Sequence, residues 1–103
     1  MQERSIPEAA LRDPNSIEML RVWIAEKKLH CSMKVGMYQE TMKVPEEVAW
    51  GTILADVARH LANALHEGYG HDKSATLRRI SDKFLDEIDK STSAASGGFV
   101  SKQ

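Results

Sequence analysis

The sequence has little cysteine and no long apolar run. Its 103 residues include a single cysteine, Cys31, which excludes an internal disulfide and a zinc site built from cysteines. No apolar stretch approaches the ~20 residues that a membrane-spanning helix needs. Residues 1–5 hold no apolar core of a secretory signal. We therefore expect a cytoplasmic protein that does not bind a membrane.

Neither sign of charge dominates the chain. Fourteen basic and 15 acidic residues give a formal net charge of -1. Nucleic-acid-binding domains usually carry a basic patch and a high net positive charge, so this balance argues against nucleic acid as the partner. Hydrophobic residues make up 42% and charged residues 28%, which is typical of a folded globular domain. A chain this short buries a modest core, and self-association would add to it.

The motifs of common enzymes are also missing. The chain contains no GxGxxG fingerprint, no phosphate-binding Walker loop and no Gly-Xaa-Ser-Xaa-Gly elbow. We therefore predict no cofactor and no catalytic residues, and consider an enzyme less expected than a binding protein.

Alternation of apolar and polar residues over 17–37 predicts a β-hairpin. Leu20, Val22 and Ile24 share one face, and after a polar break at 26–28 the alternation resumes from Leu29 onward. Cys31 falls on the same inner face, where a free cysteine usually packs as a small apolar side chain. Whether Cys31 is buried or reactive stays open.

Two amphipathic helices follow. Pro45 and the two acids behind it suit the first turn of a helix over 46–67, whose apolar residues form one stripe. Gly68 and Gly70 are candidates for its end. Asp72 is a plausible N-cap for a second helix, which extends to about residue 90.

The order of these elements predicts an α+β fold, a β-hairpin followed by two α-helices (ββαα). We expect a flexible lead-in over 1–15, one α+β domain over 16–91 and a disordered Ser- and Gly-rich tail over 92–103. The helices would cover the inner face of the hairpin. Both outer strand edges would stay unpaired, so we expect dimerisation to extend the hairpin edge. Alternatively, 38–44 supplies a third strand.

Four polar residues form a candidate ligand site. Asp56 and His60 are one turn apart on the first long helix, and His66 and His71 lie at its end. Carboxylate and imidazole groups bind transition metals and transfer protons. The alternative is an exposed ion pair with polar loop residues, since no HExxH or other specific zinc motif is present. Whether any metal binds stays open.

Three further residues suggest a pocket or an interface. Gly51 sits in the first turns of a helix, where glycine costs ~1 kcal/mol relative to alanine, so we expect something to approach its backbone closely. That neighbour would be the sheet, the other helix, a ligand or a partner subunit. Trp50 is beside it, and Trp23 lies on the outer face of the hairpin. Aromatic side chains often line pockets and interfaces.

Three stretches of sequence carry a resemblance to a known family. They are LRVW at 20–23, LHCS at 29–32 and WGxxLADVARH at 50–60. The chain resembles short proteobacterial proteins of similar length that are classified as a domain of unknown function. The resemblance covers about residues 17–67. It implies a cytoplasmic bacterial protein, and it assigns no activity and no functional residues.

Three functions remain in competition. The first is a non-enzymatic binding or interaction module that acts as a homodimer with an unknown protein partner. The second is a small metal-binding protein or enzyme that uses Asp56/His60 and the His66–His71 loop. The third and weakest is a nucleic-acid-associated regulator. It would need one basic patch formed by Arg21, Lys27, Lys28, Lys34 and Arg59.

Overall fold

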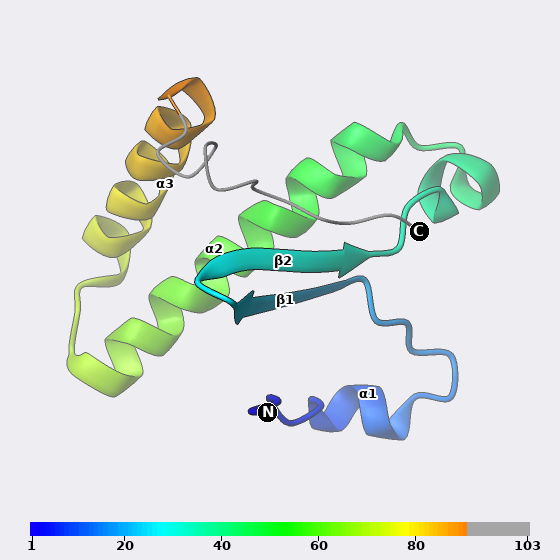
Figure 1. Ribbon diagram of the computed structural model, residues 1–103, viewed down its shortest axis with the longest axis horizontal. Helices are drawn as coiled ribbons and strands as arrows, with labels where there is room; N and C mark the ends of the chain where they lie inside the picture. The colour runs from blue at the N-terminus through cyan, green and yellow to red at the C-terminus, as the bar shows by residue number, and fades with distance from the viewer. Residues whose placement is uncertain (91–103) are drawn as a thin grey trace. The chain divides into compact units, whose positions relative to one another are not determined.

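The computed structural model describes residues 1–90, and the tail predicted to be disordered, 92–103, lies outside them (Figure 1). The described residues form two compact units, which we call the hairpin unit (1–35) and the helical unit (36–90). The elements in chain order are α1 (Glu8–Arg12), β1 (Leu20–Ala25), β2 (Lys28–Met33), the π-helical turn η1 (Tyr38–Met42), α2 (Glu46–Tyr69) and α3 (Lys73–Lys90). The predicted α+β class, a β-hairpin followed by helices, is confirmed.

The strands β1 and β2 pair antiparallel as a two-stranded sheet (Figure 1). The register places Val22 opposite Cys31 and Ile24 opposite Leu29. Because side chains alternate between the two faces of a strand, these four apolar residues share one face, as the alternation predicted. Cys31 is buried, with 6% of its surface exposed.

The hairpin turn has an unusual sequence for its geometry. Glu26 and Lys27 connect the strands, with φ of 53° and 64°. Two central residues with positive φ are the mark of a type I′ turn, which matches the twist of the strands and favours Asn-Gly. Lys28 already belongs to β2, so the predicted polar break is one residue shorter than expected.

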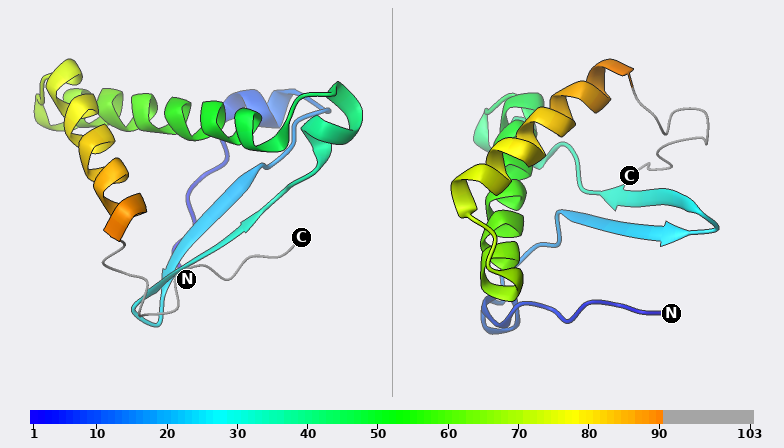
Figure 2. Two further views of the ribbon diagram at one scale, coloured as in Figure 1. Left: turned by 90° about the horizontal axis from the view of Figure 1, so that it is seen from above. Right: turned by 90° about the vertical axis from the view of Figure 1, so that its left-hand side faces the viewer.

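Local signals set the ends of the helices. The predicted helix at 46–67 is confirmed as α2, but it continues past Gly68 and ends at Gly70, whose φ of 74° is left-handed. The predicted N-cap is also confirmed, because Asp72 Oδ2 accepts a hydrogen bond from the backbone N–H of Ala75 at 2.9 Å. Figure 2 shows α3 turning back from the end of α2.

The segment considered as a third strand forms η1 instead. The backbone N–H of Val44 donates to the carbonyl of Tyr38 at 3.2 Å, and Lys43 ends the turn with a φ of 56°. The sheet therefore gains no third strand from residues 38–44. Within residues 1–90, no helix is both long and apolar enough to cross a bilayer.

Candidate functional site

Asp56 and His60 lie one turn apart on α2, as predicted. The carboxylate of Asp56 pairs with the guanidinium of Arg59, three residues on, and both side chains are about 60% exposed. Within the described part of the chain, the side chain of His60 has no hydrogen bond or ion pair. Asp56 is thus engaged in an ion pair along the helix surface.

The two other histidines meet at the end of α2. The Nδ1–H of His66 donates to the backbone carbonyl of His71 at 2.9 Å. Since a carbonyl only accepts, this bond places a proton on Nδ1 and leaves Nε2 available when the ring is neutral. His60 lies six residues, or ~9 Å of helix rise, before His66. In residues 1–90 no group of three or more His, Cys, Asp or Glu side chains is arranged to hold a metal ion.

Trp50 belongs to a polar corner centred on Glu46, which the sequence predicted only as a helix-start residue. The indole Nε1–H of Trp50 donates to Glu46 Oε2 at 3.1 Å, and the backbone N–H of Gln39 donates to Oε1 at 3.0 Å. The backbone N–H of Gly36 is the main cause of a lowered pKa at Glu46, and partial burial opposes it. This carboxylate therefore joins the start of η1 to the start of α2. An acid four residues before a tryptophan was the available signal.

Gly51 does not have the close neighbour that we expected from within the chain. A Cβ atom built on Gly51 would meet nothing within 4 Å among the described residues. The expectation of a nearby sheet or helix is therefore wrong there, and an external ligand or partner remains. Gly51 instead lines an open space of about 410 Å³ between α2 and α3.

We call this space the interhelical groove. The α2 side carries Gly51, Ala55 and Ala58, and the α3 side carries larger residues such as Leu77 and Phe84. The small residues recur every three or four positions, so they form one row along α2. Leu54 and Arg59 also line the α2 side, so the small residues form one row within that wall, and the α3 wall is mostly apolar.

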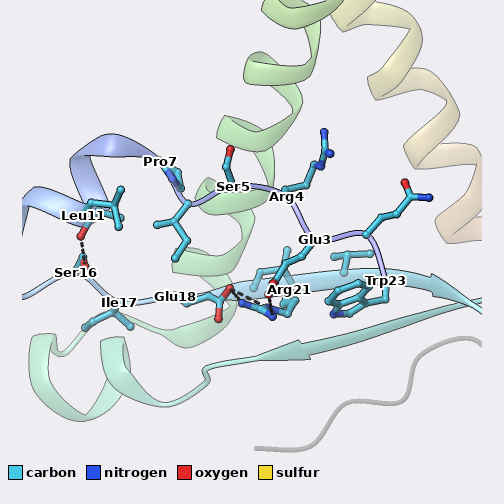
Figure 3. A pocket seen from close by; sticks show the side chains of 15 residues that line it. Glu3, Arg4, Ser5, Pro7, Leu11, Ser16, Ile17, Glu18, Arg21 and Trp23 are labelled. Atoms are coloured by element: carbon cyan, nitrogen blue, oxygen red, sulfur yellow. Dashed lines mark hydrogen bonds and ion pairs between the residues drawn. The ribbon is translucent and has the colours of Figure 1, made fainter.

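Trp23 lies at a second hollow, in the hairpin unit. A cleft of about 600 Å³ separates the N-terminal segment 2–7 from β1 (Figure 3). At its centre the guanidinium of Arg21 contacts Glu3 at 2.6 Å and Glu18 at 3.0 Å, and lies 6.0 Å from the centre of the Trp23 ring. The hydrogen bond to Glu18 is the main cause of a raised pKa at Arg21. Two carboxylates thus compensate this cation, and Glu3 was not foreseen from the sequence.

The fold and these sites define a small α+β protein with a hollow on each unit, the cleft beside β1 and the interhelical groove. The chain belongs to the family described as Domain of unknown function (DUF5076), whose sequence pattern matches residues 3–92. This confirms the predicted resemblance. No protein with a curated functional description matches the chain.

One similar solved structure comes from the photosynthetic bacterium Rhodopseudomonas palustrus CGA009 and is described as a "putative pyruvate dehydrogenase". The two chains are 22% identical, with a TM-score of 0.63, over 89% of this chain and 88% of the other. At this identity the likeness shows a shared fold and carries no activity across.

Proposed function

We propose that this protein is a non-enzymatic interaction module that acts as a homodimer. The observation that supports this most is where the apolar side chains lie. In residues 1–90 the buried apolar residues are Cys31, Ala49 and Ala62, which are all small. Large apolar side chains stay open in both units, with Ile24 75% exposed and Ile88 65% exposed. Large exposed apolar surfaces of this kind mark interaction sites.

The hairpin offers one route to association. The backbone N–H of Lys34 donates to the carbonyl of Met19 at 3.0 Å, which makes these two residues a hydrogen-bonded pair of the ladder. Such pairs alternate along antiparallel strands, so Leu29 and Cys31 direct their backbone groups away from β1. An outward row of this kind accepts a strand from another chain. Within residues 1–90 the sheet has two strands only.

The proposal also includes the cellular compartment. A single cysteine suits a reducing compartment, and the structural relative is bacterial, so a bacterial cytoplasmic setting is part of the proposal.

The proposal is tested by mixing two differently tagged copies at micromolar concentration. We expect each tag to co-purify the other copy, and native mass spectrometry of the untagged protein to give twice the chain mass of 11.5 kDa. Exchanging the tags between copies controls for association through a tag. A mass of one chain at every concentration tested, with no co-purification, would refute the homodimer.

A further inference from the structure

The outer half of α3 presents an apolar surface beside the interhelical groove. Phe84, Leu85 and Ile88 are 49%, 61% and 65% exposed, and Leu54 across the groove is 40% exposed. Figure 2 shows that α3 diverges from α2 toward its own end, and the exposed fractions show that these side chains are left largely uncovered. An amphipathic helix normally buries such a stripe against another element.

The α2 wall of the groove indicates what kind of element fits. Its row of small residues, Gly51, Ala55 and Ala58, allows a helix to approach more closely than larger side chains would. Gly51 costs ~1 kcal/mol of helix stability relative to alanine, with no atom of the described chain near its missing Cβ. A helix entering from outside would use the space that this glycine leaves.

The charges of α3 indicate which helix this is. Residues 73–81 hold three basic residues and no acidic one, whereas 82–90 hold four acidic residues and two basic ones. Two copies of α3 placed antiparallel would set each basic half beside the acidic half of the other. A parallel pair would instead align like charges. The helix is therefore electrostatically complementary to itself only in the antiparallel direction.

One pair of residues makes this complementarity specific. Arg78 and Asp89 are 11 residues apart, three helical turns, and so lie on the same flank of the apolar stripe. Within residues 1–90 neither side chain has an ion-pair partner, whereas Lys83 and Lys90 are paired with acids of their own helix. In an antiparallel pair, flanks of the same kind face each other. Arg78 of each copy then meets Asp89 of the other.

We propose that α3 of a second copy docks antiparallel along α3 at the interhelical groove, about a two-fold axis near Lys83 and Phe84. This rests on the proposed homodimer and names its interface. The axis lies beside Phe84, at the start of the exposed apolar residues of α3, so Phe84 and Leu85 of the two copies meet near the axis and Ile88 lies against the preceding turns of the partner helix. Complete burial of their exposed surface in both copies would remove at most roughly 700 Å² of apolar surface from water, and a specific interface of ~1,000 Å² also needs contacts from the flanking residues.

Charge reversal tests the pairing. Arg78→Glu places two acids face to face, and Asp89→Arg places two bases face to face, so each single variant should raise the dimer dissociation constant by about tenfold or more. The double variant restores opposite charges and should return to within about threefold of wild type. An equimolar mixture of the two single variants should form a heterodimer. Sedimentation velocity across a concentration series measures all four.

Matched controls distinguish this interface from other modes of association. Arg79→Glu makes the same change to the charge of this half of α3 one residue away, on another side of the helix, and should change the dissociation constant by less than about threefold. If the wild type is a dimer and neither single reversal weakens it, this interface is refuted. The homodimer would then form in another way, for instance through the hairpin edge. A wild-type monomer at every concentration refutes both. Leu85→Asp is a further test, and it should weaken the dimer. If it lowers the thermal midpoint without weakening the dimer, the chain covers its own groove and the proposal is overturned.

Discussion

The hairpin unit and the helical unit are stabilised in different ways. In the helical unit, local sequence signals agree with the structure: Pro45 precedes α2, a left-handed Gly70 ends it and Asp72 caps α3. In the hairpin unit, Glu26 and Lys27 occupy a turn whose backbone geometry favours other residues. The helical unit is therefore specified by local signals, whereas the hairpin depends on its strand pairing and apolar face. Contacts made by the apolar face of the hairpin therefore contribute more to the stability of the hairpin unit than to that of the helical unit.

The largest effect is expected from enlarging the most buried side chain of the helical unit. Ala62 is 3% exposed and continues the row of small residues formed by Ala55 and Ala58. Ala62→Leu adds volume where none is free, so the free energy of unfolding of the helical unit should fall by about 1–3 kcal/mol. Hydrogen exchange resolved by residue should show faster opening of α2 and α3, with a smaller change in β1 and β2.

The control for this variant is Ala64→Leu, which makes the same substitution on an exposed side of α2. Both residues favour helix formation, so the control should change the free energy of unfolding by less than ~0.5 kcal/mol. Equal losses from the two variants would mean that the helix, and not the packing at Ala62, is being disturbed.

The hairpin should become more stable when the two residues of its turn are replaced by residues that suit the backbone geometry of the turn. Glu26→Asn with Lys27→Gly replaces two residues for which left-handed φ is unfavourable by residues that adopt it readily. We expect the hairpin to gain about 1 kcal/mol of stability, seen as slower hydrogen exchange in β1 and β2. Lys28→Gly, inside β2, is the matched control and should destabilise the hairpin. Faster exchange in the Asn-Gly variant would contradict the type I′ assignment.

Most of the fold was predictable because its signals are local. Period-two alternation predicted both strands, and the apolar stripe predicted α2 from Glu46 onward. The turn at Glu26 was not predictable in type, since its residues carry no preference for left-handed φ. The π-helical turn at 38–42 was missed for a related reason. It depends on Glu46, a residue outside the turn, accepting hydrogen bonds from its first backbone groups.

The candidate site was less accessible to sequence reasoning. Spacing correctly put Asp56 and His60 on neighbouring turns, but it could not show that the carboxylate of Asp56 pairs with Arg59. Nor could it find the Glu3–Arg21 ion pair, because 18 residues separate the two and no periodicity connects them. The glycine at position 51 suggested a close neighbour, but the structure shows the opposite. Gly51 lines an open groove and has no close neighbour among residues 1–90.

The smallest expected effect is a loss of stability in acid, which should distinguish the helical unit from the hairpin unit. The pKa of Glu46 is lowered, first by the N–H of Gly36, so its carboxylate stabilises the folded helical unit above its ordinary pKa. This contribution is lost as the pH falls through the lowered pKa of the folded state.

Glu46→Gln should therefore have a lower thermal midpoint than wild type at pH 7, and the gap should close in acid. Trp50 fluorescence, recorded in a Trp23→Phe background, reports on this corner directly. Glu47→Gln removes the adjacent charge of the same first turn, which controls for the helix dipole, and should show a smaller gap at pH 7 than Glu46→Gln. A Glu46→Gln deficit that persists unchanged in strong acid would show that lost packing, and not the ionised carboxylate, stabilises the corner.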